Sequence, residues 1–247
     1  MKSLTENLSL LRWAVHYEGF PFTVFRIAVK ATSLVGARGT RSEWFQQLTE
    51  GRFDKRFNVE TSGLMKPDEM QIPDDRLEHT VEYSPTSANR FGWLLSNLPV
   101  DLSQYTFIDF GSGKGRALLM ASEFPFKQVV GIEFARELHE TALKNIQSFR
   151  SRKRQCNSVQ SFNQDATEFQ FPDDPLVLFF FNPFSAEILK QVLNNLQSSL
   201  DKTPRDVIAL YYNPLHANVF QESPLFSKPD FCPNPGAGWE LYTTSSF

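Results

Sequence analysis

The stretch that most constrains this 247-residue chain is a glycine-rich turn placed between two apolar runs. Residues 111–115 read G-S-G-K-G, and they directly follow the apolar run 107–110, in which the one acid is Asp109. This order predicts a buried strand, a tight turn and then a helix, because glycine allows a positive φ and leaves room for a ligand to touch the backbone. The free N–H groups at the start of such a helix point into the same space.

A second carboxylate stands where a nucleotide-binding fold needs one. Glu133 ends the next apolar run, about 20 residues after Gly111, which is the spacing at which α/β folds place the acid that holds a ribose diol. The strand, the turn, the helix, the second strand and the acid together favour a ligand that contains adenosine. A glycine cluster without the other features would be weak evidence for such a ligand.

The glycine spacing bears on which ligand this is. Dinucleotide folds favour G-x-G-x-x-G, which brings a pyrophosphate onto the helix N-terminus, whereas this turn reads G-S-G-K-G after Asp109. An acid beside the turn repels a pyrophosphate and suits a positively charged amino group. S-adenosylmethionine carries an amino group and a sulfonium but no phosphate. An α/β domain without a nucleotide and an NAD-dependent Rossmann oxidoreductase remain as alternatives.

At these residues the sequence resembles the class I (seven-strand) S-adenosylmethionine-dependent methyltransferases, whose first motif commonly reads as an acid followed by G-x-G-x-G. Asp-x-Gly-Ser-Gly-x-Gly with a downstream Gly-x-Glu also resembles the non-SET protein lysine methyltransferases. The resemblance covers roughly residues 80–247. It implies that Glu133, with Phe134 beside it, binds the ribose and that Asp109 lies close behind the turn. The turn residues that it places at the cofactor are Gly111, Ser112, Gly113 and Gly115.

The resemblance implies further cofactor contacts on both sides of this motif. A short strand followed by Asp165 and Ala166 resembles the adenine-binding corner of the family, where the carboxylate accepts from the exocyclic amine and the next backbone N–H donates to the ring. The alternative is an ordinary Asx turn. Relatives often bring a turn just before the core across the methionine end of the cofactor, which points to Tyr83 and Thr86. Thr86 or Ser87 is also a natural N-cap for the next helix.

The fourth predicted strand ends in Asn182, Pro183 and Phe184. An asparagine side-chain carbonyl and the backbone carbonyl before a proline can accept both N–H hydrogens of a neutral amine, and an aromatic ring can wall the site. The triplet resembles the Asn-Pro-Pro-Tyr/Phe loop of amide- and adenine-N-methylating relatives, with one proline fewer. It predicts these three residues as the catalytic site, with help from Tyr212 and Asn213 at the end of the next strand. The alternative is an Asn-Pro turn that only closes a strand.

The order of elements predicts an α/β fold with a doubly wound, Rossmann-like, seven-stranded sheet in the order 3-2-1-4-5-7-6, the last strand antiparallel. The predicted parallel strands are 106–110, 128–132, 159–162, 176–181 and 207–212, and the terminal hairpin pairs 225–228 with 239–244. The predicted core helices are 114–123, 136–149 and 186–200. We expect residues 80–247 to form the S-adenosylmethionine-binding methyltransferase domain.

Residues 1–79 are expected to form a helical extension with a segment that could act as a lid. The extension begins with two short helices broken at residues 19–21, followed by a helix over 43–48 and a polar stretch up to residue 75. The second helix is basic and amphipathic. Such a helix can lie on a membrane but more often packs onto its own domain, so we expect no membrane contact.

Composition bears on the methyl acceptor and the compartment. The net charge is −3, and the one basic cluster, residues 150–154, fits the end of a helix, where cations complement the helix dipole. A protein acceptor, lysine first, is therefore favoured over a small molecule or a nucleic-acid base. The four histidines and two cysteines show no metal-ligand spacing, so no metal is expected. With no signal peptide and no apolar run of about 18 residues, the cytoplasm is the expected compartment.

A different class of function stays open. A domain that binds S-adenosylmethionine without catalysis, as a sensor or scaffold, would carry the same glycine turn. The polar residue at the mouth of the fourth strand favours an enzyme, because a binding module could have any loop there.

Overall fold

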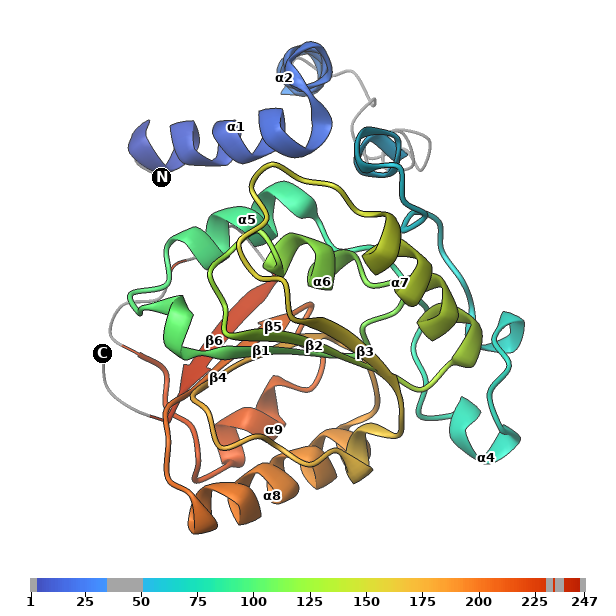
Figure 1. The fold of residues 1–247 in the computed structure, drawn as a ribbon, viewed down its shortest axis with the longest axis vertical. Helices are drawn as coiled ribbons and strands as arrows, with labels where there is room; N and C mark the ends of the chain where they lie inside the picture. The colour runs from blue at the N-terminus through green and yellow to red at the C-terminus, as the bar shows by residue number, and fades with distance from the viewer. Residues whose placement is uncertain (1–3, 35–50, 230–232, 234–237, 245–247) are drawn as a thin grey trace.

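The computed structural model describes residues 4–34, 51–229, 233 and 238–244. Within these residues six strands form one sheet in the order β3-β2-β1-β4-β5-β6, with helices on both faces (Figure 1). All neighbouring strands are parallel except β5 and β6, which are antiparallel. The strands are β1 (Thr106–Phe110), β2 (Gln128–Glu133), β3 (Val159–Asn163), β4 (Leu176–Phe181), β5 (Val207–Tyr212) and β6 (Trp239–Thr243). The doubly wound α/β fold with an antiparallel last strand is confirmed.

The predicted count of seven strands is wrong by one for the described residues. The segment 225–228 forms a single antiparallel bridge, in which the backbones of Ser227 and Thr243 exchange two hydrogen bonds of 2.9 Å. Pro224 and Pro229 flank the segment, and a proline cannot donate to a strand ladder, so the pairing stops after one bridge. The bridge lies on the outer edge of β6, where the predicted order places its sixth strand.

The core helices lie where the sequence predicts them. Helices α5 (Ala88–Ser96), α6 (Arg116–Ala121) and α7 (Arg136–Ser148) cover one face of the sheet, and α8 (Ala186–Lys202) and α9 (Ala217–Glu222) cover the other (Figure 1). Helix α6 begins two residues later than predicted because Gly115, with a φ of +82°, forms its N-cap. Ser87, not Thr86, is the N-cap residue of α5, and its side chain makes no capping hydrogen bond.

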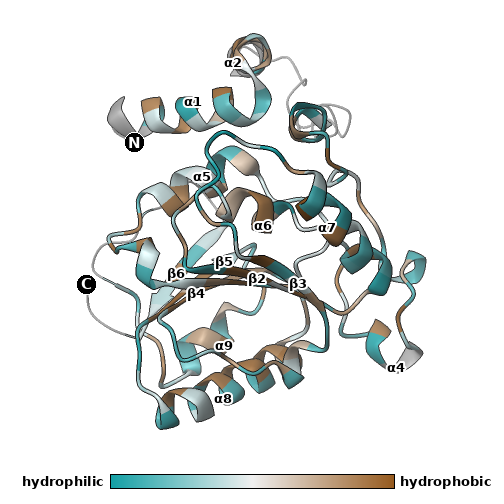
Figure 2. Cartoon of the chain, viewed as in Figure 1, coloured by the Kyte–Doolittle hydropathy of each residue, from teal (hydrophilic) through white to brown (hydrophobic). Residues whose placement is uncertain are grey.

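The central strands separate two apolar clusters, one on each face of the sheet. Successive side chains of a strand point to opposite faces, so Phe107 and Phe179 enter one cluster while Ile108 and Phe180 enter the other. Every residue of β1 is buried, as expected for a central parallel strand that is covered on both sides. Figure 2 shows the brown of hydrophobic residues along the strands in the middle of the sheet. The first cluster also takes in aromatic residues from the first 60 positions, among them Tyr17, Phe53 and Phe57.

The N-terminal segment adds a further layer above α5 and α6 (Figure 1). Helices α1 (Leu4–Glu18) and α2 (Phe20–Leu34) are broken at Gly19, which has a φ of +87°. Helix α1 is fixed by Trp13, which stacks on Phe124, and by His16, whose Nε2 lies 2.9 Å from Glu123. The helix predicted over 43–48 lies outside the described residues. Two short helical turns, η1 (Pro67–Glu69) and α4 (Asp74–Leu77), follow in this segment, and two more, η2 (Leu102–Gln104) and η3 (Ala166–Glu168), lie in the rest of the chain.

No helix in the described ranges combines the length and the apolarity that crossing a bilayer requires. No group of three or more His, Cys, Asp or Glu side chains in these ranges is placed to hold a metal ion. Cys156 is buried as a free thiol, and Cys232 lies outside the described residues.

A buried ion pair links residues 54–62 to the first turn of α6. Arg116 Nε donates to Thr61 Oγ1 at 2.6 Å, and Arg116 Nη2 lies 3.3 Å from Asp54 Oδ1. Asp54 also accepts from the backbone N–H groups of Thr61 and Ser62. Burial alone would raise the pKa of Asp54, but hydrogen bonds from Ser62 and Thr61 and the charge of Arg116 lower it overall.

Replacing Asp54 by asparagine should lower the free energy of unfolding by about 1.5–3 kcal/mol, the range for hydrogen bonds to a charged group. The reason is that an amide offers fewer acceptor sites to these donors and removes the negative charge of Asp54 beside the buried Arg116. Chemical denaturation measures the change. Asp101→Asn is the matched control, because Asp101 also accepts from a backbone N–H and a serine hydroxyl, but at the surface. Equal losses in the two variants would contradict the prediction.

Candidate functional site

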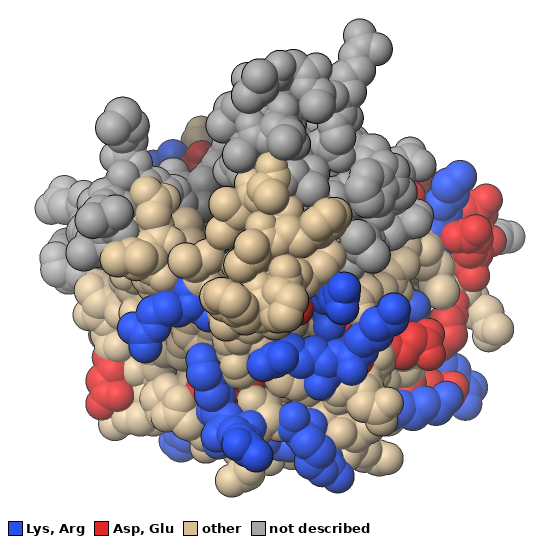
Figure 3. Space-filling model, turned by 90° about the horizontal axis from the view of Figure 1, so that it is seen from above, with Lys and Arg blue, Asp and Glu red and all other residues tan. Residues whose placement is uncertain are grey.

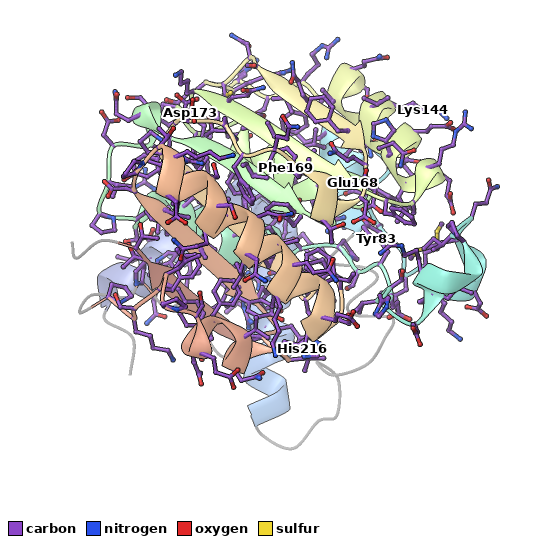
Figure 4. The ribbon with its side chains drawn as sticks, turned by 90° about the horizontal axis from the view of Figure 1, so that it is seen from below. Tyr83, Lys144, Glu168, Phe169, Asp173 and His216 are labelled. Carbon is purple, nitrogen blue, oxygen red and sulfur yellow. The ribbon has the colours of Figure 1, made fainter. Side chains whose placement is uncertain are left out.

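A cavity of about 1040 Å³, including the space at its mouth, lies at the carboxyl ends of β1, β2 and β4. Open α/β sheets bind their ligands at this position. In Figure 4, Tyr83 lies at this end of the sheet and Asp173, which comes shortly before β4, lies at the opposite end. The predicted site residues that line the cavity are Tyr83, Thr86, Asp109, Gly111, Ser112, Gly113, Glu133, Phe134, Asp165, Ala166, Asn182, Pro183 and Phe184.

Three residues singled out from the sequence do not line the cavity. Gly115 lies below the turn as the N-cap of α6, and its role is to let the chain enter the helix with a positive φ. Tyr212 and Asn213 end β5, but neither is among the residues that line the cavity, and Tyr212 stacks on Trp239 instead.

The glycine turn is pressed between two other segments. Gly111 and Gly113 have φ values of +73° and +53°, a region that side-chain-bearing residues rarely adopt. A Cβ atom on Gly113 would lie 2.2 Å from the ring of Tyr83, and one on Gly111 would lie 2.5 Å from Cβ of Pro183. The turn therefore touches both the 79–86 segment and the turn after β4, and glycine is required at both positions for space as well as for conformation.

Glu133 is held at the end of β2 by backbone donors. Its two carboxylate oxygens accept from Gly113 N at 2.7 Å and from Ala135 N at 2.8 Å, and the residue is 8% exposed. Burial raises the pKa of Glu133 to about 7, although these N–H groups pull it down. Burial and the nearby Glu133 also raise the pKa of Asp109 well above its usual value. Two carboxyl groups thus lie against the glycine turn.

The raised pKa of Glu133 predicts a pH dependence of stability. A carboxyl group with a pKa near 4.5 when unfolded and about 7 when folded binds more protons in the folded state between these values. Its contribution to stability is therefore largest at low pH and is lost as the pH rises through 7. From pH 5 to pH 8 we expect the free energy of unfolding to fall by about 2–3 kcal/mol more in the native chain than in Glu133→Gln. Parallel pH profiles of the two proteins would contradict this.

Asp165 forms the Asx turn that the sequence left open as an alternative. Its Oδ1 accepts from Thr167 N at 2.8 Å and from the hydroxyl of Thr167, as the N-cap of η3. Its other oxygen, Oδ2, pairs with Arg76 at 2.8 Å. Arg76 also lines the cavity, so the carboxylate faces the cavity beside a cation of the 65–86 segment. The two readings of Asp165 are compatible, because each uses a different oxygen.

The turn after β4 is buried and is tied to its neighbours. Asn182 is 2% exposed and has a φ of +42°, and its Oδ1 accepts from the hydroxyl of Tyr211 at 3.2 Å. Phe184 forms a β-bridge with Thr80. His79 Nδ1 lies 3.0 Å from the hydroxyl of the next residue, Ser185, which caps α8. The 79–86 segment is thereby attached to the turn that carries Asn182.

Sequence reasoning missed several of these neighbours. Arg76, His79 and Thr80 line the cavity, and Tyr211 lies behind Asn182, yet no motif marked them. The polar, proline-containing composition before residue 80 suggested a lid-like segment but could not place its side chains. Tyr211 had one weak signal, namely its position at the end of a strand adjacent to β4.

Ser112 carries the one turn side chain with unused hydrogen-bonding capacity. Its Oγ is buried and finds no partner among the described residues, although it lies beside Gly131 of β2. A buried hydroxyl normally has a partner, so this atom is the unsatisfied polar group of the turn.

No protein-family model and no curated protein matches the chain. Solved structures with a similar arrangement include an RNA methyltransferase from Salinibacter ruber in complex with S-adenosyl-L-homocysteine, at 19% identity and a TM-score of 0.43, covering 64% of this chain and 91% of that one. A ribosomal protein L11 methylase from Lactobacillus delbrueckii subsp. bulgaricus has 17% identity and a TM-score of 0.42, covering 63% and 75%. A magnesium protoporphyrin IX methyltransferase from Synechocystis PCC 6803 with bound SAM has 16% identity and a TM-score of 0.41, covering 62% and 74%.

Proposed function

We propose that this chain is a class I S-adenosylmethionine-dependent methyltransferase that methylates an amine nitrogen. The observation that carries the proposal is that Glu133, the turn 111–113 and Asn182 line a single cavity at the carboxyl ends of β1, β2 and β4. Glu133 and the turn fit a nucleoside with an amino-acid tail, and Asn182 fits a nitrogen nucleophile beside that ligand.

The chemistry of the lining supports S-adenosylmethionine as the cofactor. Glu133 can accept from both ribose hydroxyls, and the backbone of the turn can bind the methionine part. Asp165 and Ala166 line the cavity and would contact adenine, with Asp165 Oδ2 shared between adenine and Arg76. The turn reads G-S-G-K-G and not the G-x-G-x-x-G of dinucleotide folds, which disfavours NAD. When bound, S-adenosylmethionine supplies a methyl group on a positively charged sulfonium.

Asn182 and its neighbours would orient the nucleophile. A protonated amine has no lone pair, so the site must hold the nitrogen neutral and direct the lone pair at the methyl carbon. Asn182 Oδ1, which already accepts from Tyr211, has a second lone pair, and the backbone carbonyl that precedes Pro183 offers another acceptor. The nitrogen then forms the N–C bond while the C–S bond breaks toward sulfur, and the ammonium product loses a proton to water. Positioning and exclusion of water supply most of the rate.

A protein amine, lysine first, is the acceptor that we favour. The whole chain carries a net charge of −3, which favours a cationic acceptor over a polyanion. Incubation of a cell lysate with tritiated cofactor tests this. Label in the protein fraction supports the proposal. Label only in RNA, DNA or small molecules would show that the acceptor is not a protein. Binding of the cofactor without transfer of its methyl group to any fraction would favour a sensor.

Replacing Glu133 by alanine should weaken cofactor binding by about 10- to 150-fold, which corresponds to the loss of charge-assisted hydrogen bonds. Isothermal titration with S-adenosylmethionine, S-adenosylhomocysteine and NAD measures both identity and affinity. Glu140→Ala, an exposed glutamate on α7, is the matched control and should bind normally. If the protein binds NAD but not S-adenosylmethionine, the oxidoreductase alternative is correct. If Glu133→Ala binds S-adenosylmethionine as tightly as the native chain, Glu133 does not contact the cofactor.

A further inference from the structure

Helix α2 exposes its apolar side and turns its polar side inward. Phe22 and Thr23 are buried, and Arg26 pairs with Glu18 of α1 at 2.9 Å. The exposed side chains described on α2 are all apolar, namely Phe20, Pro21, Val24, Phe25, Ile27 and Ala28. Phe20 is 66% exposed and Ile27 is 49% exposed. A surface helix of a globular domain normally shows the reverse pattern.

The exposed apolar residues form one sector of the helix. Positions 20, 24 and 27 recur at the spacing that places residues on the same side of an α-helix. Helix α1 packs against α2 and adds Leu8 and Leu11, which are 52% and 37% exposed. A contiguous exposed apolar surface marks an interaction site, because its exposure to water has a free-energy cost that binding would relieve.

Cations lie close to α1 and α2. The guanidinium of Arg52 lies 4.6 Å from the centre of the Phe22 ring, and Lys153 Nζ lies 4.4 Å from the Trp13 ring. Arg56 reaches the break between α1 and α2 at Gly19. The nearby carboxylates of Glu18 and Glu123 are 10% and 0% exposed and are already paired. Figure 3 shows this face, with Lys and Arg gathered beside the uncharged protrusion and Asp and Glu toward its sides.

We propose that the basic apolar face, formed by Phe20, Val24, Phe25 and Ile27 with Arg52, Arg56 and Lys153, docks on a lipid bilayer that contains anionic lipids. A bilayer offers an apolar layer directly beneath negatively charged headgroups, which matches this combination of side chains. The face protrudes from the molecule at its outermost helix, so it suits insertion into a surface better than capture of a peptide (Figure 1).

The composition of this face argues against two other binding partners, a second copy of the chain and a nucleic acid. Two copies of the chain joined through this face would bring cations against cations, which disfavours self-association. A nucleic acid would satisfy the cations but would leave the apolar sector in water. The sequence-based expectation that α2 packs its apolar side onto its own domain is replaced by this proposal, since Phe25, Ile27 and Ala28 point to solvent.

Co-sedimentation of the full chain with vesicles tests the proposal. Vesicles of phosphatidylcholine with phosphatidylglycerol should bind the protein, and vesicles of phosphatidylcholine alone should bind it much more weakly. The double variant Phe20→Gln, Ile27→Gln should lower the partition coefficient by about tenfold or more. Leu215→Gln is the matched control, because Leu215 is 68% exposed and lies outside this face. Circular dichroism confirms that each variant is folded.

The cationic part of the face has its own test. The double variant Arg52→Gln, Lys153→Gln should weaken binding to the anionic vesicles by about fivefold for each cation lost, and added salt should reduce the difference. Lys190→Gln, on exposed α8 beyond the opposite face of the sheet, is the control. Equal binding to both kinds of vesicle would overturn the proposal. So would vesicle binding that neither double variant changes, or a dimer in light scattering that Phe20→Gln, Ile27→Gln abolishes while no vesicle is bound.

Discussion

Replacing Gly113 by alanine is expected to weaken S-adenosylmethionine binding by about two to three orders of magnitude. The new Cβ would need a φ of +53° and would lie 2.2 Å from the Tyr83 ring. The ring cannot withdraw freely, because the Tyr83 hydroxyl donates to the carbonyl of Thr61 at 2.6 Å. Either the turn shifts, which breaks the hydrogen bond from Gly113 N to Glu133, or Tyr83 moves within the cavity lining. Both changes alter the surface that would receive the cofactor.

Two further variants separate backbone strain from the clash. Gly63→Ala places alanine at a φ of +88° with nothing within 4 Å of the new Cβ, so it carries the strain alone and should leave binding intact. The double variant Gly113→Ala, Tyr83→Ala removes the ring and should recover part of the lost affinity. Isothermal titration measures all three proteins. If Gly113→Ala binds as tightly as the native chain, the turn is not in the binding site.

The elements that the sequence predicted well are those with strong local signals. Alternating apolar runs, glycines and the acid at Glu133 placed β1, β2 and the turn between them, because each feature depends on residues close together in the chain. The same logic placed Asn182 at the mouth of β4. The carboxyl ends of parallel strands meet at one edge of the sheet, so residues far apart in sequence could be assigned to one cavity in advance.

The contacts that could not be predicted from the sequence are those between segments that lie far apart in the chain. Arg76 meets Asp165 across 89 positions and Tyr211 meets Asn182 across 29, and no spacing rule links such pairs. Periodicity also predicts that α2 is amphipathic without saying which side faces the protein. The inward pair of Arg26 with Glu18 decides that, and it leaves the apolar side exposed. The predicted sixth strand, 225–228, did not form for a local reason, since prolines at both ends limit it to one bridge.

The second large effect is expected from Asn182→Gly, which should lower kcat by about a hundred- to a thousandfold with little change in the affinity for S-adenosylmethionine. Loss of one pre-positioned polar group beside the reacting atoms has a cost of this order. Glycine is the right replacement because it adopts the φ of +42° of Asn182 without strain, so the side chain is removed and the turn is kept. Rapid-quench measurement of methyl transfer separates this step from binding.

Asn213→Gly is the matched control for Asn182→Gly. Asn213 also ends a strand, also precedes a proline and also has a positive φ, of +51°, but it is exposed and does not line the cavity. Removing the side chain of Asn213 should leave kcat unchanged. Tyr211→Phe removes the hydroxyl that donates to Asn182 Oδ1 and should give an intermediate loss, because the amide stays but is no longer held. If Asn182→Gly turns over as fast as the native chain, the Asn-Pro turn only closes β4. An equal loss in the two glycine variants would mean that the effect is one of folding and not of the reaction.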